Sequence, residues 1–233
     1  ELKKIKRCSK YANSLGIAYI ASYLNKRGHD AWLYNADYVS DYGYIKIKKI
    51  FSNFNSYKDY FQDKDNAIWH EVKDNIIRFK PDWVGYTSYT ANISAIKIIS
   101  DHVKKADPSI KQVVGGVHAT LDSDILDTLK SIDYSVQREG EEAFTALVEN
   151  KNPKFIPGVV SRDKGGILFK TGIAPVIKNI DNLPMPERNK FWNIPEHERK
   201  NVDVSYVNTI RGCPYKCTYC ASPFHWDRKT TRL

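Results

Sequence analysis

Three cysteines lie close together near the end of the chain, at Cys213, Cys217 and Cys220, with the spacing C-x3-C-x2-C. They belong to the segment Arg-Gly-Cys-Pro-Tyr-Lys-Cys-Thr-Tyr-Cys-Ala-Ser, which covers residues 211–222. A loop this short can direct three thiolates toward one point. Pro214 stiffens it, and Gly212 allows the backbone to approach a bound group closely. Three thiolates are one ligand short of a closed four-iron cluster or a tetrahedral zinc site.

Two kinds of metal site are consistent with this spacing. A four-iron cluster held by three cysteines has one iron free to bind a substrate or a cofactor. A structural zinc site needs a fourth protein ligand, and His225 is the nearest residue of a suitable type. Disulfides fit less well, because three clustered cysteines cannot all pair and Cys8 is far away in the sequence. The spacing favours the cluster, and zinc remains the alternative.

The elements that must position this loop begin with a short apolar segment, Val204–Ile210, which is typical of a buried strand. It places the cysteines on the loop that leaves its carboxyl end. Further upstream, helical and strand patterns alternate. Helices are expected over residues 14–27, 69–79, 92–105, 122–130 and 141–149, and strands over 31–35, 83–87, 112–115 and 132–136. This order predicts an α/β fold with a doubly wound parallel sheet and helices on both faces.

This pattern contains four strands, where such a sheet usually has five. The missing strand would precede the first helix and occupy the middle of the sheet. We therefore expect further sequence before residue 1, or a poor substitute strand formed by residues 2–8. Position 1 is not a methionine, and the chain ends soon after Cys220, so we expect it to be cut at both ends.

The pattern changes after residue 150. Residues 158–169 are typical of a β-hairpin with its turn near 163–166. The segment Leu-Pro-Met-Pro-Glu-Arg at 183–188 is an extended connector, because each proline disfavours helix in the residue before it. We expect three parts: a sheet domain over 1–150, a linker with a β-hairpin over 151–202, and the start of a further domain over 203–233.

Composition narrows the function classes. The chain of 233 residues is 42% hydrophobic and 27% charged, with no apolar run near the ~20 residues that span a membrane. The first residues of this sequence do not resemble a signal peptide, because no apolar core follows them. Cysteines grouped as a metal site indicate a reducing cytoplasm. The net charge is +9, but the lysines are scattered among acidic residues. We therefore do not expect a nucleic-acid partner, and the charge is compatible with a small anionic molecule.

A cofactor site is expected in the sheet domain, because ligands of open α/β sheets bind beyond the carboxyl ends of the strands. Three stretches meet this condition: Asn-Ser-Leu-Gly at 13–16, Thr-Ser-Tyr-Thr at 87–90 and Gly-Gly-Val-His-Ala-Thr at 115–120. Taken singly, each also fits a tight turn with capping hydroxyls. The candidate residues are Asn13, Leu15, Gly16, Thr87, Ser88, Tyr89, Gly115, Gly116, Val117 and His118.

The segment Arg-Gly-Cys-x-x-x-Cys-x-Tyr-Cys resembles the cluster loop of the radical S-adenosylmethionine (SAM) enzymes. The resemblance implies that the cysteines hold a [4Fe-4S] cluster, that the fourth iron binds SAM, and that Tyr219 lies near the adenine. Several further segments are similar, in order and spacing, to the cobalamin-dependent members of that family. They are residues 15–24 with 28–29, 84–88, 113–120, 139–142 and 183–188. This implies a Rossmann-like cobalamin-binding domain, with Glu139 and Gly140 in a cofactor loop, followed by the first strand and cluster loop of a truncated radical SAM barrel.

Two departures from the family pattern bear on the cobalamin. Related domains carry Asp-x-His-x-x-Gly before the first helix, and here Tyr11 and Asn13 stand at the Asp and His positions. A carboxamide is a poor cobalt ligand, so we expect cobalamin bound without histidine ligation, in a crevice beside Gly115 and Thr87. Gln137-Arg138 also precedes Glu139 where the family more often has Arg-Gly. At a helix start, Glu139 is equally explained by the helix dipole.

The activity implied by the resemblance is methyl transfer to an unactivated carbon, through a 5′-deoxyadenosyl radical and methylcobalamin, on a small-molecule or peptide substrate. The sequence indicates neither the substrate nor catalytic residues. The rest of the barrel needs on the order of 200 residues, so we expect this chain alone neither to turn over nor to hold a stable cluster. The alternatives are a cobalamin-binding sensor without catalysis and a zinc-stabilised binding module.

Overall fold

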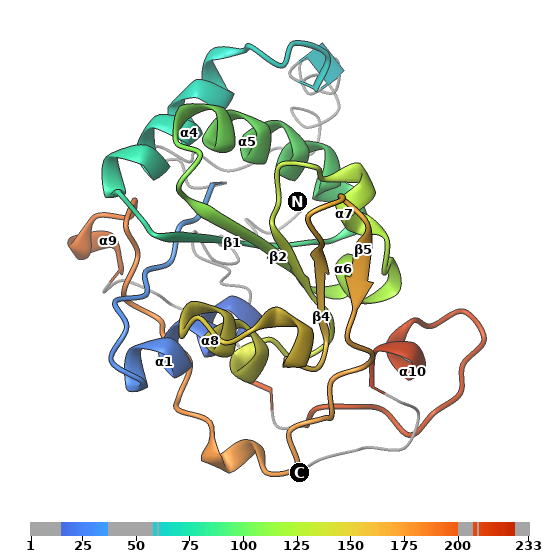
Figure 1. The fold of residues 1–233 in the computed structure, drawn as a ribbon. Coiled ribbons are helices and arrows are strands. Elements are labelled where there is room, and N and C mark those ends of the chain that lie inside the picture. Colours follow the sequence, from blue (N-terminus) through green and yellow to red (C-terminus); the bar gives the residue numbers. More distant parts are fainter. Residues whose placement is uncertain (1–14, 37–57, 60, 200–206, 209, 227–233) are drawn as a thin grey trace, which may run out of the picture.

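The computed structural model describes residues 15–36, 58–59, 61–199, 207–208 and 210–226. Its centre is a five-stranded sheet in the order β1-β2-β3-β4-β5 (Figure 1). β1 (Trp83–Thr87), β2 (Lys111–Gly115) and β3 (Tyr134–Val136) are parallel, whereas β4 (Val159–Arg162) and β5 (Leu168–Lys170) continue the sheet in antiparallel pairs. The fold is therefore a mixed α/β sheet.

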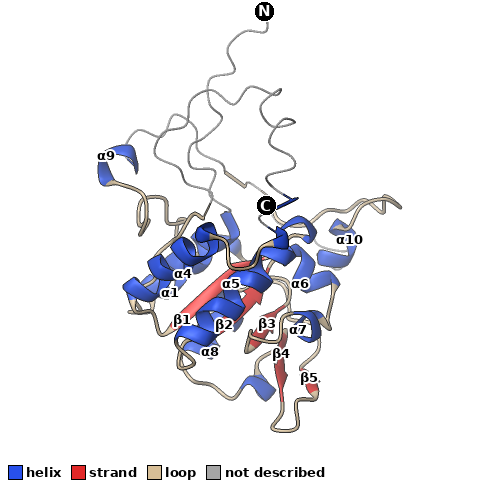
Figure 2. Cartoon of the chain, turned by 90° about the horizontal axis from the view of Figure 1, so that it is seen from above, coloured by secondary structure: helices blue, strands red, loops and turns tan. Residues whose placement is uncertain are grey.

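Helices cover both faces of this sheet. α4 (Ala67–Phe79) and α5 (Ile93–Ala106) lie on one side, and α8 (Glu141–Val148) and α1 (Leu15–Lys26) lie on the other (Figures 1 and 2). The short helices are α6 (Val117–Leu121), α7 (Ile125–Thr128), α9 (Glu196–Arg199) and α10 (Ser222–His225). Single 3-10 turns occur at Thr90–Asn92, Pro153–Phe155 and Ile180–Asn182. The expected layers of helix on both faces are confirmed.

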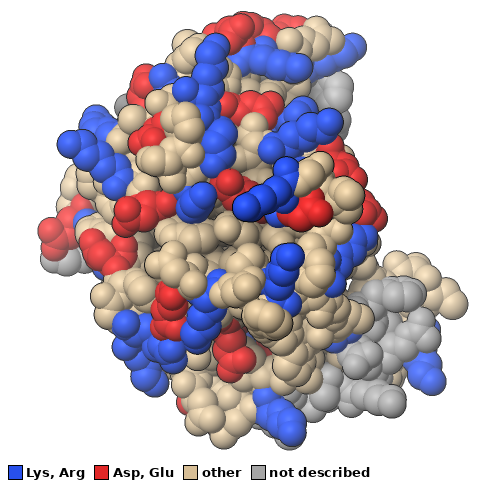
Figure 3. Space-filling model, in the orientation of Figure 1, with Lys and Arg blue, Asp and Glu red and all other residues tan. Residues whose placement is uncertain are grey.

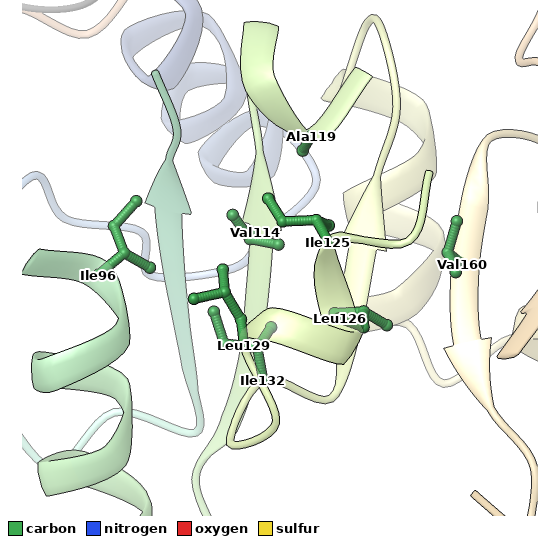
Figure 4. Packing of buried hydrophobic residues seen from close by; sticks show 8 residues of the cluster. All are labelled: Ile96, Val114, Ala119, Ile125, Leu126, Leu129, Ile132 and Val160. Carbon is green, nitrogen blue, oxygen red and sulfur yellow. The ribbon is translucent and has the colours of Figure 1, made fainter. Parts of the chain in front are cut away.

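The strands feed two apolar layers because their side chains alternate between faces. Val113, Val136 and Val159 pack with α8 on one face. On the other face, the residues in contact are Ile96, Val114, Ala119, Ile125, Leu126, Leu129, Ile132 and Val160 (Figure 4). A strand buried on both sides loses its polar alternation, which is why β2 and β4 each contain two adjacent valines, one for each layer.

A separate cluster joins the two ends of the described chain. Ala18 and Ala21 of α1 pack with Leu33, Phe191 and Ile194, and all five are buried. α1 itself packs on α8. The first helix is therefore held by segments that lie far from it in the sequence.

The helix predicted at 69–79 forms as α4 and shows a capped start. The side-chain oxygen of Asn66 accepts a hydrogen bond from the Ile68 N–H at 3.2 Å. The helix ends at Lys80, which takes left-handed backbone angles. Trp69 and Ile76 are buried against α5. An amphipathic pattern bounded by these end signals is enough to define the helix.

Asn66→Ala is expected to lower the free energy of unfolding by about 1 kcal/mol, because the first turn of α4 loses its side-chain acceptor. Asn66→Ser keeps an acceptor for the Ile68 N–H and adds no charge beside Asp63, so it is expected to recover much of this loss. Urea denaturation followed by circular dichroism measures both variants. Equal losses for alanine and serine would show that the side-chain acceptor does not stabilise the helix.

The strand expected at 31–35 is wrong. Leu33 forms only an isolated parallel bridge with Phe191, in which the Leu33 N–H donates to Lys190 O and the Trp192 N–H donates to Leu33 O, both at 2.8 Å. Within the described ranges, β1 has no partner on its outer side, and its side chains are mostly half-buried. The segment pairs with residues before α9 instead of extending the sheet at β1.

Two further expectations need correction. The hairpin at 158–169 does not stand in a linker after a purely parallel sheet, because β4 pairs with β3 and Val159 and Val160 are buried in the two layers. The helix expected over 122–130 is only the short α7, preceded by α6, because Asp122 is extended and ends α6. The three-part division at residues 150 and 202 stays a prediction.

Several expectations fall outside the described residues. They are the substitute strand at 2–8, the first residue of the helix expected over 14–27, and most of the strand at 204–210. No helix in the part of the chain that the structure describes is both long and apolar enough to cross a membrane.

Candidate functional site

The carboxyl ends of β1 and β2 meet in register, with Thr87 opposite Gly115. Ser88, which follows β1, is fully buried. Its hydroxyl donates to Gly115 O at 2.7 Å and accepts from the Ala119 N–H at 3.1 Å. One serine therefore ties the end of β1 to the end of β2 and to the first turn of α6.

Gly116 carries the backbone from β2 into α6 with φ +96° and ψ −169°. A Cβ atom placed on it would lie 2.9 Å from both the backbone N and the O of Ser88. No L-residue with a side chain fits this position without moving the β1 end. Gly115 and Gly116 together present bare backbone at the sheet edge, which suits a flat ligand or a phosphate.

His118 and the residues around it also lie at this edge, where His118 contacts Thr90 and Ser88. The His118 ring Nδ1 lies 3.0 Å from Thr90 Oγ1, and Nε2 lies 3.9 Å from Asp122 Oδ2, too long for a hydrogen bond. Val117 is half-buried at the start of α6, and Tyr89 is exposed beside it. The structure thus brings Thr87, Ser88, Tyr89, Gly115, Gly116, Val117 and His118 to one edge of the sheet, as predicted from sequence.

Glu139 and Glu141 follow β3. Both carboxylates accept hydrogen bonds from Arg211, a partner that the sequence did not indicate. Arg211 donates from Nη1 to Glu139 Oε1 at 2.9 Å and from Nη2 to Glu141 Oε1 at 2.8 Å. Its guanidinium lies 4.7 Å from the centre of the Tyr19 ring, and the Ile177 N–H donates to Glu139 Oε2 at 2.7 Å. Both carboxylates are buried. In the structure, the Glu139 carboxylate accepts hydrogen bonds from Arg211 and from the Ile177 backbone.

Charge in this network is set by burial and by the close partners. Burial raises the pKa of the Glu141 carboxyl, and this outweighs the attraction of Arg211, which lowers it. Burial alone would lower the pKa of Arg211, but Glu141 and Glu139 raise it above its usual value. The guanidinium therefore stays charged between its two carboxylates.

The other predicted cofactor residues that the structure describes lie in α1 or pack against it. Gly140 precedes α8, and a Cβ on it would lie 2.9 Å from Cδ1 of Ile20, so α1 and α8 pack closely here. Leu15 is half-buried and Gly16 exposed at the start of α1, one turn before Tyr19. Asn13 lies outside the described residues.

The cysteine loop supplies the right donor atoms but does not gather them. Cys213 and Cys220 are half-buried, Cys217 is exposed, and none of the three forms a disulfide. Hydrogen bonds from the side chain and backbone of Ser222 lower the pKa of the Cys220 thiol, which favours the thiolate that a metal requires. In the described part of the chain, no three His, Cys, Asp or Glu side chains are grouped to hold a metal ion. The cysteine ligands stay a prediction.

Two other side chains predicted for this region are Tyr219 and His225. Tyr219 is 91% exposed. His225, on α10, is partly buried with no hydrogen-bond partner for Nδ1, and burial lowers the pKa of its imidazole, with Arg138 adding to the effect. A zinc site completed by His225 is not formed among these residues.

The cavities do not mark the expected crevice. A cavity of about 410 Å³ lies at the amino ends of the strands, lined by Trp83, Lys111 and Tyr134, and another of about 730 Å³ lies beside α4. Neither is beside Gly115 and Thr87, where a tetrapyrrole was expected. The fit of that edge to a flat cofactor depends on its bare glycine backbone.

A mixed sheet with helices on both faces and a glycine-rich carboxyl edge defines an α/β ligand-binding domain of the Rossmann-like class. The model of the B12 binding domain family matches residues 8–148. This match covers more than half of the chain, and the chain therefore belongs to that family.

The most similar relatives found include enzymes of two kinds. An uncharacterized methyltransferase of Pyrococcus horikoshii is 25% identical over 170 residues, covering 71% of this chain and 37% of the relative. The anaerobic magnesium-protoporphyrin IX monomethyl ester cyclase of Cereibacter sphaeroides is 26% identical over 170 residues, covering 70% and 28%. The chain thus spans about a third of the length of these relatives.

Solved structures confirm the predicted likeness to cobalamin-dependent radical SAM enzymes at the level of fold. The radical SAM methyltransferase TsrM of Kitasatospora setae matches with a TM-score of 0.54 and 15% identity, over 92% of this chain and 40% of that one. The cobalamin-dependent radical SAM enzyme OxsB matches with a TM-score of 0.56 and 17% identity, over 89% and 26%.

Proposed function

We propose that this chain is the cobalamin-binding domain and cluster loop of a cobalamin-dependent radical SAM methyltransferase. One observation carries the proposal. A B12 binding domain is connected, through the buried side chain of Arg211, to a C-x3-C-x2-C loop in the same chain. A sensor that only binds cobalamin would have no use for three such cysteines. The fold neighbours and the Pyrococcus horikoshii methyltransferase support the same class of reaction.

The chain's own residues would bind and orient the cofactors. Gly115 and Gly116 would present backbone without side chains to the corrin, and Ser88 holds the two strand ends in place. Cys213, Cys217 and Cys220 would hold three irons of a [4Fe-4S] cluster, with Tyr219 free to contact the adenine of SAM. When bound, the cluster with SAM supplies a radical that removes hydrogen from an unactivated carbon, and cobalamin supplies the methyl group.

The substrate proposed is a small molecule or a peptide. Figure 3 shows Lys and Arg interspersed with Asp and Glu over the face drawn, where a nucleic-acid-binding face would be expected to concentrate basic residues. This distribution supports a small substrate over a nucleic acid.

Cobalamin binding without histidine ligation is tested by adding hydroxocobalamin under anaerobic conditions and reducing it. We expect saturable binding in the ultraviolet–visible spectrum. The electron paramagnetic resonance spectrum of the cobalt(II) form should lack splitting from an axial nitrogen, because we expect the benzimidazole tail of the cofactor to be displaced and Asn13 stands at the usual histidine position. His118→Ala serves as the control and should leave the spectrum unchanged.

A nitrogen splitting that disappears in His118→Ala would show that a histidine binds cobalt after all. Absence of any corrin binding, or one zinc and no iron per chain after expression, would contradict the proposed function and favour the zinc-stabilised module.

A further inference from the structure

The cysteine loop begins at a buried ionic anchor. Arg211 is 9% exposed, and the side chains of Glu139 and Glu141 are each 4% exposed. The two Nη atoms of one guanidinium bond to two different carboxylates, and the plane lies over Tyr19 of α1. Because the fork is rigid and each arm has its own acceptor, the contact fixes the guanidinium and so tethers the backbone at residue 211 to the sheet domain.

The other end of the loop also rests on the sheet domain. α10 begins two residues after Cys220 and packs on α6, the helix that directly follows Gly115 and Gly116. Figure 2 shows α10 beside α6. The thiols at 213–220 thus lie on a span held at one end by α8 and α1, and at the other end by α6.

We propose that Arg211 is a positioning residue, which with Glu139 and Glu141 holds the cysteine loop at the carboxyl edge of the sheet. The cofactor part of this inference rests on the proposed function, whereas the anchoring itself does not. Removal of one partner from a buried ion group leaves the others unpaired in a low-dielectric site, so the group resists partial opening. The anchor therefore sets the position of the cysteine loop relative to the carboxyl edge of the sheet, where the corrin is proposed to bind.

The anchoring is tested on the chain without cofactors. Iodoacetamide alkylation of Cys213 and Cys220 is followed by mass spectrometry in wild type, Arg211→Gln and Arg211→Lys. Arg211→Gln should raise both rates about tenfold or more, because local opening no longer has to break a buried ion group. Arg211→Lys should fall between, since an ammonium cannot bond two carboxylates with the same fork.

The matched control is Arg27→Gln, which breaks the Arg27–Glu149 pair at 2.8 Å on the surface, away from the loop. It should leave the alkylation rates unchanged. Circular dichroism must show the sheet folded at the same temperature. If Arg211→Gln does not fold, Glu141→Gln replaces it, with the same expected increase. Unchanged rates in the folded variants would overturn the anchoring.

The link to the cofactor is tested with hydroxocobalamin. In wild type, its binding should slow alkylation of the loop thiols severalfold. In Arg211→Gln, it should bind with unchanged affinity, yet protect the thiols no longer. Protection retained in Arg211→Gln would overturn the positioning role. Failure of wild type to bind hydroxocobalamin would contradict the proposed function and leave the cofactor-free result to decide the anchoring.

Discussion

Gly116→Ala is expected to lower the free energy of unfolding by about 3 kcal/mol, because backbone strain and a steric clash act together. The residue has φ +96° and ψ −169°, a region that only glycine enters readily. Its Cβ would also lie 2.9 Å from two backbone atoms of Ser88, which cannot swing away as a flexible side chain can. Denaturant unfolding of the variant, followed by circular dichroism, measures the loss.

Two other glycine substitutions separate backbone strain from steric crowding. Gly166 has φ +83° and nothing within 4 Å of its Cβ position, so Gly166→Ala reports strain alone, about 1 kcal/mol. Gly115 has an ordinary φ and a contact of 3.4 Å with Val136 O, so Gly115→Ala reports mild crowding. If Gly116→Ala costs no more than Gly166→Ala, the close approach of Ser88 does not constrain this edge.

Gln112→Met is expected to lower the free energy of unfolding by about 3 kcal/mol, because three buried or partly buried groups lose a hydrogen-bond partner. Gln112 is fully buried in β2. Its Nε2 donates to Ser100 O and Ser131 O, both at 3.0 Å, and its Oε1 accepts from the Tyr86 hydroxyl at 2.6 Å. Burial raises the pKa of Tyr86, so this hydroxyl remains a donor.

A double-mutant cycle tests this network. Tyr86→Phe leaves only one acceptor unpaired and should cost about 1–2 kcal/mol. The double variant should cost less than the sum of the two, because the Tyr86 bond is lost only once. Lys111→Met, at the exposed neighbouring position, should stay within about 0.5 kcal/mol of wild type. Strict additivity of the two buried variants would mean that they do not interact.

Local periodicity carried the sequence predictions that succeeded. Ile96, Ile99 and Val103 share one helical face, and all three are buried in α5. The edge formed by Thr87 and Gly115 followed from the rule that parallel strands end on one side. Both inferences need only spacing within a short segment.

Pairing between distant segments is what the sequence did not reveal. Arg211 bonds to carboxylates about 70 residues away, and no periodicity indicates which acid it meets. A weak signal existed, because two acids, Glu139 and Glu141, flank Gly140 at the start of a predicted helix. The strand expected at 31–35 failed for the same reason: its apolar residues pack equally well against Phe191, whose place in the fold no local pattern gives.

The cluster that unites α1 with Phe191 and Ile194 has a consequence for biosynthesis. α1 leaves the ribosome before the side chains that cover it, which are translated more than 160 residues later. At ordinary elongation rates this gap lasts on the order of ten seconds. During that interval Ala18, Ala21 and Leu33 have no Phe191 or Ile194 to cover them, so a chaperone that shields nascent apolar helices should raise the yield of native chain.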